Sequence, residues 1–205
     1  MFETRFKAEL VAINIENLLI SKLWSEIESS YSQPDRHYHN LRHLDSLISE
    51  LLTIRTTIAD WQTIVFSIAY HDIVYNILKQ NNEEKSADFA VKRLQLLQMP
   101  RSKIIACKHQ ILATKNHDIS FDNDTNYFID ADLAILGADS ETYEIYTQKI
   151  RKEYKFYPDF IYNPGRKKVL SHFIQMGQIY KTQYFSSKYE QQARKNIEEE
   201  FRKLG

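Results

Sequence analysis

Histidines and aspartates in two short motifs are the residues of this chain that could do chemistry. The segment RHYHNLRH, residues 36–43, holds three of the seven histidines. His39 and His43 are four residues apart, so they share a face if the segment is helical. His71 and Asp72 are adjacent and follow an apolar run, IVFSIAY. Imidazole and carboxylate are ligands that Mn, Fe, Co, Ni, Zn and Mg accept, so the two motifs indicate a candidate metal centre.

Two further carboxylates, Asp130 and Asp132, lie in the apolar segment FIDADLAIL. A buried carboxylate needs a cation or several hydrogen-bond donors. One histidine, the His-Asp pair and one of these aspartates would leave positions open for water and a substrate oxygen. Such a centre favours hydrolysis, because the ion lowers the pKa of water and polarises a phosphoryl oxygen. Each motif also has a structural interpretation, as capping aspartates or hydrogen-bonded histidines, and the residues alone leave both open.

Helices must position these residues, because helical spacing of apolar side chains dominates the chain. The spacing predicts a first helix over about residues 4–30 and a second over 41–52. Asp60 is a predicted N-cap for a third helix, which runs directly into His71. The chain has only 4 Gly and 4 Pro, so we expect few turns.

Further helix boundaries are expected in the last third of the chain. Gly137 is predicted to end an element as its C′ residue, and Asp139 or Ser140 to cap the next helix. Asn163 followed by Pro164 resembles an N-cap and first helical residue. The sequence therefore predicts a single all-α domain over residues 1–205, with about seven to nine helices.

Composition excludes several classes of protein. The 27 Lys and Arg balance 27 Asp and Glu, which argues against a nucleic-acid partner. The lone Cys107 excludes an intrachain disulfide and a zinc ribbon. Neither GxGxxG nor GxxxxGK[ST] occurs, so phosphate would be held by metal and side chains. With no signal peptide and no apolar run of membrane-spanning length, we expect a cytoplasmic protein without a membrane partner.

The motifs resemble those of the HD superfamily of metal-dependent phosphohydrolases, which is named for a His-Asp doublet in the order H…HD…D. Here the order is His43, His71-Asp72 and Asp132. The segments RHYHNLRH, AYHDIVYN, NNEEKSA, TKNH, FIDADLAILG and IRKEY are similar to those of a bacterial branch of predicted phosphohydrolases of about 200 residues. The similarity runs from about Trp24 to the C-terminal helix, with the core motifs in residues 36–154.

The resemblance implies an all-helical HD fold around one divalent ion, Mn, Mg, Zn, Fe, Co or Ni. Its implied ligands are His43, His71, Asp72 and Asp132, with Asp72 also counted as a catalytic residue. Asp132 is preferred over Asp130 because superfamily members tend to place the ligand directly before the apolar continuation.

Other residues near the motifs are candidates for supporting roles. Glu84 is a candidate general base, and His39 and His117 are candidate proton donors or ligands of a second ion. Three cations are candidate phosphate ligands and four tyrosines are candidate stacking partners of a base; these are Arg36, Lys115, Arg151, Tyr31, Tyr38, Tyr70 and Tyr75. Each also has a structural interpretation, as a surface cation, a cap or a core aromatic residue.

We therefore expect an enzyme, a metal-dependent phosphohydrolase that cleaves a phosphate ester or anhydride by attack of metal-bound water. Its partner would be a small phosphorylated substrate, with nucleotides the favoured class, and a homodimer is left open. Two alternatives remain at this point: a di-iron oxygenase on the HD scaffold, and a nucleotide-binding sensor without turnover.

Overall fold

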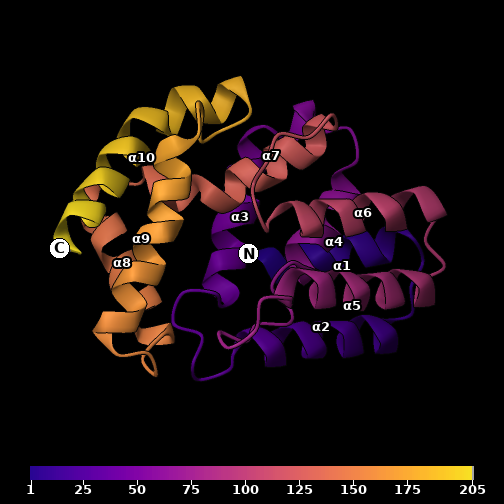
Figure 1. The fold of residues 1–205 in the computed structure, drawn as a ribbon. Coiled ribbons are helices and arrows are strands. Elements are labelled where there is room, and N and C mark those ends of the chain that lie inside the picture. Colours follow the sequence, from indigo (N-terminus) through magenta and orange to yellow (C-terminus); the bar gives the residue numbers. More distant parts are fainter. Residues whose placement is uncertain (205) are drawn as a thin grey trace. The chain divides into compact units, whose positions relative to one another are not determined.

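The structure is a computed structural model that describes residues 1–204, and within them it is 72% helix with no strand. The all-α class expected from the sequence is confirmed. Residues 1–204 form ten α-helices and two short 3₁₀ helices, and Figure 1 labels the α-helices. Their bounds are α1 (Phe2–Ala12), α2 (Asn17–Tyr31), α3 (Leu41–Thr53), η1 (Arg55–Thr57), α4 (Trp61–Tyr70), α5 (Asn82–Leu96), α6 (Arg101–Ala113), α7 (Asn123–Asp132), η2 (Leu133–Gly137), α8 (Ser140–Glu153), α9 (Asp159–Gln175) and α10 (Gln183–Lys203).

The contacts divide the chain into two compact units, Met1–Ile129 and Asp130–Gly205. The first unit holds α1 to α6 and most of α7. The boundary falls inside α7, so one continuous helix belongs to both units. The expectation of a single domain over residues 1–205 stays a prediction.

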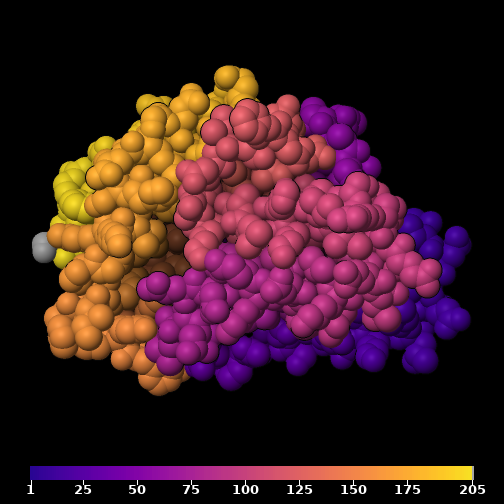
Figure 2. Space-filling view, turned by 45° about the vertical axis from the view of Figure 1, so that its right-hand side comes forward, coloured from indigo at the N-terminus to yellow at the C-terminus, as the bar shows by residue number. Residues whose placement is uncertain are grey.

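Helix α4 is the centre of the first unit. Nine of its ten residues are buried, and α1, α3, α5 and α6 all contact it. Asp60 caps it as expected, accepting a hydrogen bond from the Thr63 amide at 3.2 Å. In the space-filling view, the magenta and pink residues of α5 and α6 lie beside the indigo N-terminal helices (Figure 2). The surrounding helices bury α4, and His71 follows its last residue.

The helix expected over residues 4–30 is two helices, α1 and α2. Between them Asn14 adopts a left-handed backbone with φ of 59°, a conformation that asparagine tolerates better than most residues. The apolar spacing continues on both sides of this turn: Phe6 in α1 lies 6.3 Å, centroid to centroid, from Trp24 in α2. Because the apolar spacing continues across Asn14, the sequence pattern does not reveal the break between the two helices.

In the second unit, α9 begins at Asp159 and not at Pro164 as the sequence predicted. Pro158 precedes the helix as its N-cap, and Pro164 lies inside it. A proline at the sixth helical position removes the bond to the carbonyl four residues earlier and crowds that carbonyl, yet α9 continues through it. The predicted capping of α8 by Asp139 is confirmed, with the carboxylate accepting from the amides of Glu141 and Thr142.

Gly137 has a packing role and not the predicted C′ role. Its φ lies outside the left-handed region, and a Cβ built on it would lie 2.5 Å from the Cβ of Tyr189 in α10. The absence of a side chain therefore lets η2 approach α10 closely.

Replacing Gly137 with alanine is expected to lower the free energy of unfolding by about 1–3 kcal/mol, the usual cost of overpacking. Urea denaturation of the two proteins measures the difference. Gly165→Ala is the matched control: its Cβ would meet nothing within 4 Å, and alanine in a helix gains about 0.5–1 kcal/mol over glycine. Equal effects of the two substitutions would contradict the packing role.

Across residues 1–204, none of the helices has both the length and the apolar character needed to cross a membrane.

Candidate metal centre

His71 is held in one orientation at the C-terminal end of α4. It is the C-cap of this helix and only 1% exposed. Its Nδ1 lies 3.0 Å from the backbone oxygen of Ile68. A carbonyl only accepts hydrogen bonds, so Nδ1 donates and the Nε2 of the neutral ring keeps its lone pair. This partner is the kind that orients a metal-ligating histidine.

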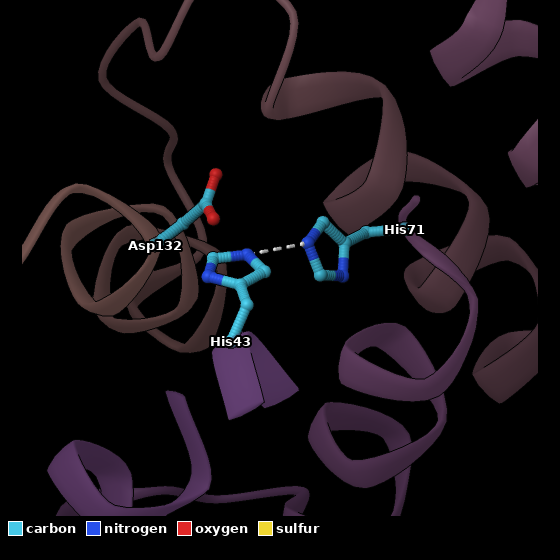
Figure 3. Close-up of side chains that lie close together, drawn as sticks. All are labelled: His43, His71 and Asp132. Carbon is cyan, nitrogen blue, oxygen red and sulfur yellow. Dashed lines mark hydrogen bonds between the residues drawn. The ribbon is translucent and has the colours of Figure 1, made fainter. Parts of the chain in front are cut away.

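His43 faces His71 from the first turn of α3. Asn40 caps this helix, its side chain accepting from the Arg42 amide. The His43 ring is 5% exposed, and its Nε2 lies 3.2 Å from the Nε2 of His71 (Figure 3). Two segments 28 residues apart in sequence thus direct their imidazole nitrogens at each other.

The distance between these nitrogens fits a shared ion. Nitrogen ligands about 2.0–2.1 Å from a metal are about 2.9 Å apart at a right angle and about 3.3 Å apart at the tetrahedral angle. The observed 3.2 Å lies within this range. The donor set of imidazole and carboxylate suits the divalent ions that the sequence suggested.

Asp132 is placed by α7. The Phe128 ring of this helix packs edge-on against His71, with centroids 5.8 Å apart. Asp132 follows Phe128 by four residues, which is one helical turn on the same face. One ligand atom from each of His43, His71 and Asp132 lies within 4.8 Å of the others, and Figure 3 shows the carboxylate beside the two rings.

Asp130 has a different role from that of Asp132. Its carboxylate accepts from the amides of Lys181 and Thr182, at 2.7 and 2.8 Å, and from the Thr182 hydroxyl at 2.7 Å. Burial raises its pKa, although these bonds oppose the shift. Asp130 therefore anchors the chain that leads into α10.

Asp72 lies at the edge of the histidine pair. Its Oδ2 is 3.3 Å from Nε2 of His71, and its side chain is 18% exposed. Among residues 1–204, the group whose ligand atoms all lie within 4.8 Å contains His43, His71 and Asp132 but not Asp72. Asp72 thus contacts the centre through His71, and direct ligation by Asp72 stays a prediction.

Arg36 links the two histidine segments. It is 6% exposed, and its Nη1 donates to the backbone oxygens of Asp72, at 2.7 Å, and His39, at 3.2 Å. Its Nη2 donates to the Ile73 oxygen at 3.1 Å. These bonds tie the turn that carries Asp72 to the loop before α3, so the geometry gives Arg36 a positioning role.

Two tyrosine rings pack against the Arg36 guanidinium. The guanidinium of Arg36 lies 4.8 Å from the ring centroid of Tyr31 and 5.2 Å from that of Tyr75. The Tyr31 hydroxyl also accepts from the Asp72 amide at 3.1 Å. We call Arg36, Tyr31 and Tyr75 together the arginine clamp. This contact could not be predicted from the sequence, because Tyr31 and Asp72 are 41 residues apart.

The tyrosines expected to stack on a base differ in exposure. Tyr31 and Tyr70 are 1% and 0% exposed, so the expectation is wrong for these two, which the core covers. Tyr38 and Tyr75 are half-exposed. Tyr38 lies 5.1 Å from His43 and Tyr75 lies 4.5 Å from His39, both measured between ring centroids.

Glu84 and Lys115 form an ion pair in the first unit. The Lys115 Nζ donates to Glu84 Oε1, and to the backbone oxygen of Gln80 at 3.1 Å. The hydrogen bond from Lys115 lowers the pKa of Glu84, and the same bond raises the pKa of Lys115. Glu84 is therefore ionised but weakly basic, and its predicted role as general base stays a prediction.

The remaining candidate residues lie in three different places. His39 is half-exposed with its ring 5.8 Å from that of His43. His117 follows α6 in the left-handed conformation, with φ of 55°. Arg151 belongs to the second unit, where it donates to Asp159 and to the backbone oxygens of Tyr154 and Tyr157. The roles predicted for these three residues stay predictions.

Comparisons with protein-family models, curated proteins and solved structures return no match. The functional argument therefore rests on the geometry of the centre.

Proposed function

We propose that this protein is a metal-dependent phosphohydrolase of the HD type, acting on a small phosphorylated compound. The observation that supports this most is the pair of buried imidazole nitrogens, 3.2 Å apart, with the Asp132 carboxylate beside them. The two nitrogens form a hydrogen bond when one of them carries a proton, and a cation between two unprotonated nitrogens would hold them equally close. A divalent ion would bind both nitrogens and one carboxylate oxygen at the same time.

The ion, when bound, would supply a water of lowered pKa and would polarise a phosphoryl oxygen. The chain's own residues have the remaining tasks in this proposal. The Ile68 carbonyl fixes the His71 tautomer, and the arginine clamp fixes the turn after it. The Asp72 carboxylate, 3.3 Å from His71 Nε2, can accept a proton from a water molecule at the centre. In this proposal His39, which is half-buried beside His43, donates a proton to the leaving oxygen.

Nucleotides are the favoured substrates within this proposal. Tyr38 and Tyr75 are half-buried aromatic rings beside His43 and His39, and a base can stack on the exposed part of such rings. The proposal also includes a cytoplasmic location, where nucleotides are abundant.

A metal-supplemented activity screen tests the proposal. The purified chain is treated with EDTA, then supplied separately with Mn, Mg, Zn, Fe, Co and Ni. Each form is tested against nucleotides, sugar phosphates and phosphodiesters. We expect phosphate release only with an ion, and about one bound ion per chain by elemental analysis, as a single centre of this donor set would hold.

Other outcomes of this screen would overturn the proposal. Two bound irons with oxygen consumption would indicate a di-iron oxygenase. A thermal shift with a nucleotide but no product with any ion would indicate a sensor. The absence of both binding and turnover for every ion and substrate would remove the case for an enzyme.

A further inference from the structure

The turn between α8 and α9 and the first turn of α9 expose large apolar side chains in the second unit. Phe156 is 70% exposed, Phe160 is 78% exposed and Ile161 is 48% exposed. They lie within six consecutive residues, so their side chains emerge from one small region. Single exposed apolar residues are common, but a group of them marks a surface that contacts something.

Lysines surround these apolar side chains. Lys152 and Lys155 precede Phe156, and both are exposed. Lys155 Nζ lies 5.2 Å from the ring centroid of Phe156. The exposed Lys168 follows Phe160 by eight residues and Ile161 by seven, spacings that share one face of α9. We call Lys152, Lys155, Phe156, Phe160, Ile161 and Lys168 the lysine-aromatic surface.

The charge of this segment is strongly asymmetric although the whole chain is neutral. Residues 149–168 contain seven Lys or Arg and two acidic residues, Glu153 and Asp159. Glu153 is 2% exposed, and the exposed Asp159 pairs with Arg151 at 2.7 Å. The outward-facing charge of the segment is therefore carried by lysines.

We propose that the lysine-aromatic surface docks on an anionic membrane surface. Lysines near such a surface are attracted by its negative potential, and aromatic and aliphatic side chains enter the boundary between headgroups and acyl chains. Both kinds of side chain, lysines and large apolar residues, are present here within a few residues. The expectation of no membrane partner rested on the lack of a spanning segment, and peripheral docking needs none.

The charge and side-chain types of this surface also favour an anionic membrane over two other partners, a second copy of the chain and a single-stranded nucleic acid. In a twofold dimer each copy presents the same surface to the other, so the lysines of two copies would repel each other. A single-stranded nucleic acid would use the phenylalanines for stacking, but the aliphatic Ile161 offers no ring to a base. An anionic lipid surface attracts the lysines and can bury both the aromatic rings and the aliphatic side chain.

Vesicle co-sedimentation with the full chain tests the proposal. Vesicles of phosphatidylcholine with about 30% phosphatidylserine should bind at least about tenfold more protein than pure phosphatidylcholine. The binding should fall steeply at about 0.5 M NaCl, where surface charges are screened. The double variant Phe156→Ser/Phe160→Ser should lose at least about tenfold in binding, as should Lys152→Gln/Lys168→Gln.

Matched variants control for non-specific adsorption by exposed apolar side chains and for the loss of positive charge elsewhere on the chain. Leu18→Ser removes a side chain that is 82% exposed on α2, and Lys22→Gln/Lys85→Gln removes two exposed lysines of the first unit. Both should bind anionic vesicles as the unaltered protein does. Equal binding to neutral vesicles, equal losses in the controls, or binding to single-stranded RNA without binding to vesicles would each overturn the proposal.

Discussion

Replacing His71 with alanine is expected to abolish metal binding and to reduce phosphate release at least about a thousandfold. A catalytic ion supplies several kcal/mol of charge stabilisation, and each 1.36 kcal/mol is a factor of ten in rate. The substitution removes one of the two facing nitrogens and leaves His43 without its neighbour at 3.2 Å. Elemental analysis and a phosphate-release assay on the same preparation give the two readouts.

A folding control is needed because His71 is buried. His71→Asn keeps a polar side chain, and circular dichroism should show unchanged helicity for this variant while metal content and turnover are lost. His109→Ala, which removes an exposed histidine from α6, should change neither. Full turnover by His71→Asn without bound metal would contradict the proposed centre.

The order of the elements around the centre could be predicted because local rules determine it. Asp60 occupies its N-cap position, and the apolar run after it becomes the buried α4, which carries His71 at its end. The pairing of His43 with His71 was predicted from motif order together with the HD resemblance. The same resemblance favoured Asp132 over Asp130, and the structure places Asp132 beside the histidines.

The supporting contacts could not be predicted, because they depend on backbone atoms and on long-range packing. The hydrogen bond between the Ile68 carbonyl and His71 could not be predicted, because a backbone carbonyl is present at every residue. In a continuous helix, the seven-residue spacing between Arg36 and His43 would be two turns, and Arg36 would then face the same cleft as a phosphate ligand. The segment between them is a loop that ends at Asn40, so this spacing does not set the direction of Arg36. Its donors point to carbonyl oxygens instead.

Replacing Arg36 with lysine is expected to weaken metal binding by about 10–100-fold, the usual effect of losing a group that orients the ligands. A lysine keeps the charge, but its ammonium lacks the planar guanidinium fork that reaches separate acceptors and stacks on rings. The oxygens of Asp72 and Ile73 would then lose their fixed donors. The turn after His71 would no longer be held to the loop before α3.

The same variant separates a positioning role from a phosphate-binding role. Loss of the clamp should lower metal affinity, measured by competition with a chelating dye, and should lower kcat when the ion is limiting. Saturating metal should restore most of kcat with KM unchanged, because the substrate contacts are intact. Arg42→Lys, an exposed change directly before His43, should leave metal affinity unaltered. A rise in KM with normal metal affinity would instead assign Arg36 to the substrate phosphate, and the bonds to the carbonyl oxygens would then have to open during turnover.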